Sequence, residues 1–299
     1  MKRPGDVRIG ISGWRYKPWR GTFYPEGLRQ ADELAYASTT FDTIEINGTF
    51  YSLQRPEYFA AWAAQTPAGF VFSVKGPRYL THLRRLKEPE KPLANFLASG
   101  VLELREKLGP FLWQFPPNFK FDASRLEAFF ALLPHDTDAA QAVARGHDAK
   151  LKGRSAIPTQ KRRRLHHAIE IRHDSFRTPE FIELLRQYDI ALVCADTVDW
   201  PRLMDVTGEF MYLRLHGSEE LYASGYDDKA LNAWADRVAA WASGAEPADA
   251  ERVIDKPAKR RKGRDVFVYF DNDIKVRAPF DAQGLRRRVA ERLGQPAGK

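Results

Sequence analysis

Short apolar segments alternate with helical patterns along almost the whole chain. The predicted β-strands are Val7–Ile11, Thr43–Ile46, Val71–Lys75, Phe111–Gln114, Ala168–Arg172, Ala191–Asp196, Met211–His216 and Val266–Phe270. Helical patterns fall between most of them, and only a short irregular segment fits between the sixth and seventh strands. Such alternation indicates βα units that build a parallel sheet. It predicts an α/β fold, a single (β/α)8-like TIM barrel spanning residues 1–299.

Two of the helical patterns carry start signals. Pro56 stands at the first helical position of "RPEYFAAWAAQTP", where its missing N–H is not needed. Asp122 is the predicted N-cap of "DASRLEAFFALLP". The alternative architecture is an open doubly wound sheet, which usually carries a G-x-G-x-x-G pattern after its first strand. The segment "GISGWRYKPWRG" lacks that spacing, so the barrel is favoured.

The composition excludes several broad classes of protein. With 43% hydrophobic and 12% aromatic residues, the chain can fill a sizeable core, which argues against bulk disorder. Cys194 is the single cysteine, so no internal disulfide can form, and this fits a reducing cytosol. The N-terminal residues lack the apolar core of a signal peptide, and no run is long enough for a membrane span. We therefore expect a cytoplasmic protein with no membrane partner.

The net charge of +8 is concentrated in two segments. They belong to predicted basic insertions at about 135–167 and 244–265, which contain the runs Lys161–Arg164 and Lys259–Lys262. A run of like charge is usually a solvated loop. The sharper interpretation is that these runs contact the phosphates of a nucleic acid or another polyanion.

Polar side chains interrupt the apolar strands close to their carboxyl-terminal ends. In "TIEIN", Ile44 and Ile46 can pack on helices, which turns Glu45 toward the barrel interior. The same alternation directs other polar groups inward, namely Asn47, Lys75, Gln114, Glu170, Arg172, Asp196, Arg214, His216 and Asp271. This is the end where barrel enzymes build their active sites. Because an unpaired buried charge is costly, these groups must pair with one another, meet water or bind a ligand.

The inward set admits other interpretations. It mixes acids with Lys75, Arg172 and Arg214, so a self-satisfied ion-pair network that fills the barrel is one alternative. His82 and His173 lie just beyond strand ends, where a lone histidine is more often a hydrogen-bonded structural residue. Metal-ligand residue types are present, but no H-x-x-H, H-E-x-x-H or C-x-x-C spacing occurs, which leaves both a metal and any cofactor open.

Seven sequence blocks stand in a recognisable order. They are "SGWRYKPWRGTFYP", "TIEINGTFYSL", "FVFSVKGPRYLTH", "KLGPFLWQFPPNF", "AIEIRHDSF", "YLRLHG" and "VYFDND". In these blocks the chain resembles the DUF72 family, also called YecE-like. The resemblance implies a TIM-like barrel and a pocket, and it transfers no reaction. The family commonly has Asn at the position of Asp271, so this chain carries an additional carboxylate there.

From these residues we expect an enzyme that binds a small polar, anionic ligand, phosphorylated or sugar-like, at the C-terminal barrel mouth. The predicted catalytic residues are Glu45 and Glu170, as acid and base, and His216, as a proton relay. The predicted ligand-binding residues are Trp14, Asn47, Tyr51, Lys75, His82, Gln114, Arg172, His173, Asp196, Arg214, Asp271 and Asn272. Fold analogy indicates a hydrolase or an isomerase.

Two other functions stay open at this point. The first is a nucleic-acid-associated protein, or a metal-dependent nuclease, in which the basic runs contact phosphates. In that case the aromatic residues of the first βα loop, Trp14 to Tyr24, stack on bases. Otherwise the same loop is a packed lid. The second function is a non-catalytic interaction scaffold, which the mixed-charge pocket fits poorly.

Overall fold

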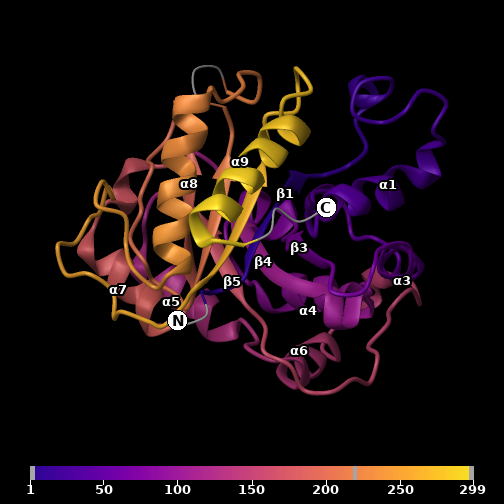
Figure 1. Ribbon diagram of the computed structural model, residues 1–299. Helices are drawn as coiled ribbons and strands as arrows, with labels where there is room; N and C mark the ends of the chain where they lie inside the picture. The colour runs from indigo at the N-terminus through magenta and orange to yellow at the C-terminus, as the bar shows by residue number, and fades with distance from the viewer. Residues whose placement is uncertain (1–3, 218–220, 296–299) are drawn as a thin grey trace. The chain divides into compact units, whose positions relative to one another are not determined.

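The computed structural model describes residues 4–217 and 221–295 and contains eight parallel strands that form a closed barrel in the order β1 to β8 (Figure 1). The strands are β1 Val7–Ser12, β2 Thr43–Ile46, β3 Val71–Lys75, β4 Leu108–Gln114, β5 His167–Glu170, β6 Ala191–Asp196, β7 Phe210–Leu215 and β8 Asp265–Phe270. The predicted TIM-barrel-like fold is therefore confirmed, and each strand lies within three residues of its expected ends. Arg172 and His216 follow their strands instead of ending them.

Helices separate most of the strands, as the sequence predicts. They are α1 Glu33–Thr40, α2 Gly48–Tyr51, α3 Pro56–Gln65, α4 Glu90–Ala98, α5 Ala123–Leu132, α6 Thr137–Ala144, α7 Pro179–Gln187, α8 Asp228–Ala242 and α9 Ala278–Leu293. Residues 197–209, between β6 and β7, contain neither helix nor strand, which confirms the expected irregular connection. The predicted insertion at 135–167 contains α6, so part of it is regular structure. Within the described ranges, no helix has both the length and the apolar character needed to cross a membrane.

The residue contacts divide the chain into two compact units. Unit 1 comprises Met1–Ile44 and Arg177–Lys299, and unit 2 comprises Glu45–Phe176. Each unit contains several strands of the barrel with helices that pack on them. The expectation that residues 1–299 act as one domain stays a prediction.

In unit 1, β6, β7, β8 and β1 pair side by side in parallel. Helices α8 and α9 lie against each other, α9 packs on β1, and both helices contact β8 (Figure 1). Gly10 of β1 has no room for a side chain, because a Cβ there would lie 1.9 Å from the carbonyl oxygen of Thr43. The Thr43 hydroxyl is hydrogen-bonded to the Tyr269 hydroxyl at 2.8 Å. This close approach holds β1 and β8 in register with the start of β2.

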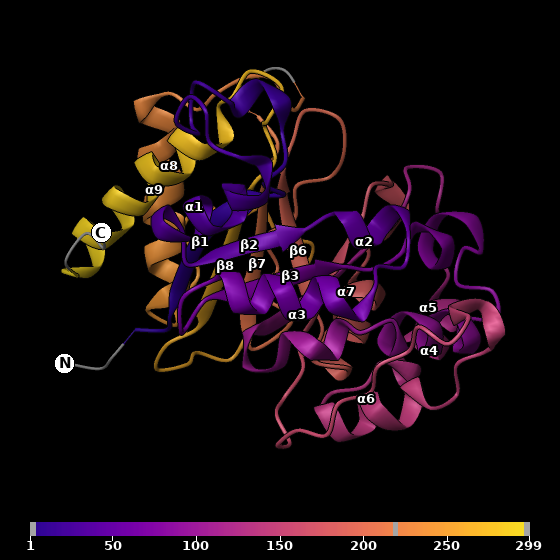
Figure 2. The same cartoon turned by 90° about the vertical axis from the view of Figure 1, so that its right-hand side faces the viewer.

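In unit 2, β3, β4 and β5 pair in parallel, and α4 lies beside α6 (Figure 2). One face of these strands is aromatic. The Trp113 ring lies 5.4 Å from the Phe129 ring, and its Nε1 donates to His167 Nδ1 at 3.1 Å. His167 Nε2 bonds the Pro134 carbonyl at 2.8 Å, and burial lowers the pKa of this histidine to about 3. His167 is thus a neutral structural residue.

The predicted cap of α5 is confirmed. The Asp122 carboxylate accepts a hydrogen bond from the backbone N–H of Arg125 at 3.1 Å. Removing an N-cap acceptor typically costs about 1 kcal/mol of stability. Asp122→Ala should therefore lower the free energy of unfolding in urea by about 1 kcal/mol. Asp122→Asn retains an acceptor oxygen and should stay close to the wild type. Equal losses in both variants would show that the cap contributes nothing.

Candidate functional site

The core of the candidate site is a carboxylate buried at the end of β5. The Glu170 side chain is 0% exposed, and its Oε1 accepts from Arg172 Nε at 2.8 Å. Oε1 also accepts from Gln114 Nε2 at 2.9 Å, because Gln114 and Glu170 are register partners on β4 and β5 and point to the same face. One oxygen of this buried acid thus accepts two hydrogen bonds, a charge-assisted one from Arg172 and one from the side-chain amide of Gln114. The structure therefore brings together three of the predicted site residues.

Lys75 ends β3 and is the second cation of the candidate site in unit 2, after Arg172. Its ammonium lies 4.4 Å from the centroid of the Phe50 ring, a favourable cation–π distance. Its backbone carbonyl accepts from the Thr49 hydroxyl at 2.6 Å, which fixes α2 beside the end of β3. Lys75 is register partner to Leu112, two residues before Gln114, so it shares the face of Gln114.

His82 lies in a single π-helical turn, Tyr79–Leu83. Its Nδ1 is 2.9 Å from the Thr81 hydroxyl, and its ring packs edge-on against Phe50 at 5.0 Å. Burial and the positive charges of Lys75 and Arg172 together lower the pKa of His82 to about 4, against the opposing effect of Glu170. His82 is therefore neutral at neutral pH and lies in an electropositive environment.

The other predicted residues of unit 2 lie in different surroundings. Glu45 is completely buried in β2. Asn47 is half-buried immediately before α2, whereas Tyr51 ends α2 and is 67% exposed. His173 Nδ1 is bonded to the Ser175 hydroxyl at 2.9 Å and accepts from the Ser175 backbone N–H at 3.0 Å. These two contacts make His173 a structural residue of a turn.

Unit 1 holds a second polar cluster around the predicted residues Arg214 and Asp271. Arg214 Nη2 donates to Asp271 Oδ2 at 2.7 Å and to the Ser12 hydroxyl at 3.2 Å. His216 Nδ1 lies 3.1 Å from the same Asp271 oxygen, so Arg214 and His216 share a face as expected. The Asp271 carboxylate, where the family commonly has Asn, thus compensates the buried charge of Arg214 within unit 1.

Asp273 is a functional candidate that the sequence reasoning missed. Burial and the negative charge of Asp271 together raise its pKa from 3.8 to about 7, while Arg214 opposes them. A carboxyl group that titrates near neutral pH, close to the charges of Asp271 and Arg214, can exchange protons. Its only sequence signal is its place as the third polar residue of "FDND", which no alternation rule marks as buried.

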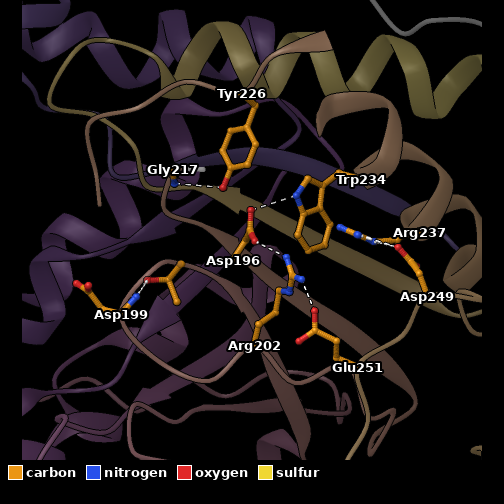
Figure 3. Close-up of polar contacts among 10 residues, drawn as sticks. Asp196, Asp199, Arg202, Gly217, Tyr226, Trp234, Arg237, Asp249 and Glu251 are labelled. Atoms are coloured by element: carbon orange, nitrogen blue, oxygen red, sulfur yellow. Dashed lines mark hydrogen bonds and ion pairs between the residues drawn. The ribbon is translucent and has the colours of Figure 1, made fainter. Parts of the chain in front are cut away.

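Asp196 corrects one prediction. Its Oδ2 accepts from Trp234 Nε1 of α8 at 3.2 Å, and its Oδ1 accepts from Arg202 at 3.1 Å (Figure 3). Arg202 also pairs with Glu251. The Tyr226 hydroxyl, which accepts from the Gly217 backbone N–H, points toward the same carboxylate (Figure 3). Asp196 is therefore bound to the helix layer, and the predicted inward orientation is wrong.

The strand register gives the physical reason for this correction. Asp196 is the partner of Leu215, whereas Ala195 is the partner of Arg214. Side chains in register on neighbouring strands point to the same face, and successive residues point to opposite faces. If Arg214 points inward, Ala195 does too, and Asp196 must face the helices. The sequence shows each alternation but not how neighbouring strands are aligned.

Two further predicted residues of unit 1 are held by the protein itself. Asn272 Nδ2 donates to Asp281 of α9 at 2.8 Å and to the Ser224 carbonyl at 2.9 Å, which links β8 to α9. The Trp14 carbonyl accepts from the Tyr24 hydroxyl at 2.6 Å. The other aromatic rings of this loop pack on one another, and Trp19 is fully buried. The loop thus has the character of a packed lid.

No group of three or more His, Cys, Asp or Glu side chains in residues 4–217 and 221–295 is placed to hold a metal ion. Some of the predicted site residues form two clusters: Gln114, Glu170 and Arg172, with Lys75 and His82, in unit 2, and Arg214, His216 and Asp271 in unit 1. The expectation that both clusters serve one ligand stays a prediction.

The fold and the order of the sequence blocks place the chain among known proteins. Residues 8–299 match the family described as "Protein of unknown function DUF72". The chain belongs to the DUF72 family. The resemblance noted in the sequence blocks is thereby confirmed.

Two curated relatives share part of this sequence. The UPF0759 protein YecE of Escherichia coli (strain K12) is 27% identical over 113 residues, 38% of this chain and 39% of the relative. The UPF0759 protein YunF of Bacillus subtilis (strain 168) is 30% identical over 118 residues, 38% of this chain and 41% of the relative. The matched segment thus spans about two fifths of either curated relative.

A solved structure confirms the fold of this DUF72 protein. A DUF72 family protein from Thermotoga maritima MSB8 superimposes with a TM-score of 0.69 at 24% identity, covering 97% of this chain and 100% of that one. At this level of identity the similarity concerns the fold alone.

The raised pKa of Asp273 predicts a pH-dependent stability. The folded protein holds this proton more tightly than the unfolded chain, since the pKa is about 7 in one and 3.8 in the other. Stability should therefore fall as pH rises from about 4 to about 7 and then level off. Because Asp273 is only partly buried, we expect Asp273→Asn to be more stable than the wild type by about 1 to 2 kcal/mol at pH 8.

This advantage should disappear at or below about pH 4, where Asp273 is protonated in both states. Thermal unfolding between pH 4 and pH 8 measures it, with the exposed Asp199→Asn as the control. A difference between Asp273→Asn and the wild type that does not change with pH would contradict the assignment.

Proposed function

We propose that this DUF72 protein is an enzyme that binds a small anionic compound, phosphorylated or sugar-like, and acts on it by acid–base chemistry. The observation that carries the proposal is the cluster of unit 2, where Lys75 and Arg172 accompany the buried carboxylate of Glu170. A buried acid accompanied by two cations combines a proton-transfer group with an anion-binding environment.

The electrostatics of His82 support the anionic character of the ligand. The cations that depress its pKa are Lys75 first and Arg172 second, with Arg78 contributing less. An anion bound beside these residues would exchange water for charge-assisted hydrogen bonds. The neutral imidazole can accept a hydrogen bond from a hydroxyl group of the same ligand.

The proposed chemistry assigns one task to each group. Glu170, oriented by Gln114 and Arg172, removes a proton from the ligand or from an attacking water. Glu45 of the same unit, also buried, supplies the matching acid. Lys75 and Arg172 stabilise the negative charge that develops in the transition state. Proton abstraction and hydrolysis are the reaction classes that these groups serve.

Within unit 1, we assign His216 to a proton relay rather than to anion binding. Asp271 Oδ2 lies 3.1 Å from the Nδ1 atom of its ring and also pairs with Arg214. The Arg214 side chain is 1% exposed and the Arg172 side chain is 12% exposed, so we assign the anion-binding role mainly to Arg172 and Lys75.

The binding part of the proposal can be tested by thermal shift with ribose 5-phosphate as the probe. The wild type should gain thermal stability with the compound, and Lys75→Met and Arg172→Gln should lose most of that gain. Arg162→Ala removes a guanidinium from an exposed ion pair with Asp136 in the same unit and should respond like the wild type. A full response in both Lys75→Met and Arg172→Gln, each folded by circular dichroism, would refute the assigned anion-binding role of these two residues.

The catalytic part needs a separate readout. Glu170→Gln keeps the hydrogen-bonding shape and removes the base, so it should still bind ribose 5-phosphate. Conversion of a bound sugar phosphate, followed by phosphorus NMR, should slow by about 100-fold or more in this variant. Equal rates in Glu170→Gln and the wild type would remove Glu170 from the chemistry.

A second candidate function, nucleic-acid binding, is favoured by one basic hollow in unit 1. It has a volume of about 610 Å³ and is lined by Pro4, Ser243, Arg260, Arg261, Lys262, Arg292 and Leu293. In the other basic run, Arg162 pairs with Asp136, and Arg163 bonds the Arg105 carbonyl and Gln160.

This candidate predicts a salt-dependent affinity. Binding of a labelled DNA duplex should weaken steeply with salt, and the double change Arg260→Ala and Lys262→Ala should reduce the log–log slope by about 2. The control pair Lys161→Ala and Arg162→Ala removes the same charge and should change the slope less. An affinity independent of salt would exclude the hollow as a phosphate site.

A further inference from the structure

Unit 2 contains a groove that the proposed chemistry does not use. It has a volume of about 360 Å³. Its walls are Phe50, Tyr51, Ser52 and Leu53 of the α2 region, Pro77, Arg78, Tyr79 and Leu83, and Pro92, Asn95 and Lys150. Lys150 belongs to the predicted basic insertion at 135–167, so one cation of that insertion lines the groove.

The groove carries large apolar side chains that face solvent. Tyr51 is 67% exposed, Tyr79 is 42% exposed and Leu83 is 66% exposed. Single exposed apolar residues are common, but a group of them around one hollow marks a binding surface. Exposed tyrosine rings offer flat faces on which another ring can stack.

Cations accompany the two tyrosines. The Arg78 guanidinium lies 5.6 Å from the Tyr51 ring centroid, and the Lys150 ammonium lies 5.1 Å from the Tyr79 ring centroid. None of the described residues that line the groove is acidic. Its lining amide, Asn95, is bonded to Asp148 on both its nitrogen and its oxygen. The surface therefore suits a flat, anionic ligand better than a neutral sugar, which needs polar partners for its hydroxyl groups.

The groove shares a wall with the acid–base cluster. Phe50 lines the groove, and its ring also contacts the Lys75 ammonium and the His82 ring. The π-helical turn Tyr79–Leu83 supplies residues to both places, since Tyr79 and Leu83 line the groove while His82 contacts Phe50. Single π-turns occur frequently at functional sites because they change which way successive side chains point.

We propose that the groove holds the base of a nucleotide. The base stacks on Tyr51 and Tyr79, and Lys75 and Arg172 of the acid–base cluster bind the phosphate. Stacking on aromatic rings together with backbone cations is the usual way in which proteins hold an unpaired base. The inference rests on the proposed function, because it names the ligand class of that same region of unit 2.

The test compares the four ribonucleoside monophosphates, each titrated singly, with ribose 5-phosphate, which lacks the base. At least one nucleotide should bind about tenfold more tightly than ribose 5-phosphate. Tyr51→Ala and Tyr79→Ala should each weaken the binding of that nucleotide by at least about fivefold and leave the affinity for ribose 5-phosphate unchanged. Tyr58→Ala is the matched control, because Tyr58 is 49% exposed in unit 2 but does not line the groove.

The outcomes separate this inference from the proposed function. Suppose that ribose 5-phosphate binds, that Arg172→Gln abolishes this binding, and that no nucleotide binds more tightly than ribose 5-phosphate. The assignment of the groove is then wrong, and the proposed function stands. If Tyr58→Ala is as harmful as the groove variants, stacking is not the cause and the assignment also falls. Binding of a single-stranded oligonucleotide without binding of any mononucleotide would overturn the small-ligand class. If neither ribose 5-phosphate nor any nucleotide binds, the inference falls together with the ligand class on which it rests.

Discussion

A carboxylate removed from water must be matched by a partner, and in this protein the pairing of Glu170 with Arg172 and Gln114 meets that requirement. An isolated buried charge would cost several kcal/mol, and removing one partner of such a pair typically costs about 3 to 5 kcal/mol. The strand register sets the geometry, because Gln114 and Glu170 are partners on β4 and β5. The same contacts that the buried Glu170 carboxylate needs for the stability of unit 2 therefore also orient it for the proposed chemistry.

In unit 1 the buried charge that needs a partner is a cation, Arg214. Arg214 is completely buried and pairs with Asp271, which also contacts His216. Asn at this position would keep a hydrogen bond but leave the arginine charge uncompensated. The extra carboxylate has a consequence nearby, since its charge helps to raise the pKa of Asp273 to about 7. The Asp271 carboxylate thus neutralises a cation and adds to the effect of burial on the pKa of Asp273.

The sequence predicted the strands, because alternation along one strand is a local property. The boundaries of β2, β3 and β6 agree with the expected ones, and Asp122 caps α5 as expected. The outward orientation of Asp196 was missed because it depends on the register between β6 and β7, which is not local. Asp273 was missed because its pKa arises from burial by distant segments. The groove of Tyr51 and Tyr79 depends on a π-turn, which has no apolar period to reveal it.

The claim on which the account depends is that Lys75 and Arg172 form an anion site beside Glu170. The most direct measurement is a crystal structure of the protein soaked in inorganic phosphate. The account predicts a phosphate ion within hydrogen-bonding distance of Arg172 and Lys75, with the bond between Arg172 and Glu170 retained. Phosphate bound only in the basic hollow of Arg260 and Lys262, with Lys75 and Arg172 free of it, would contradict the account.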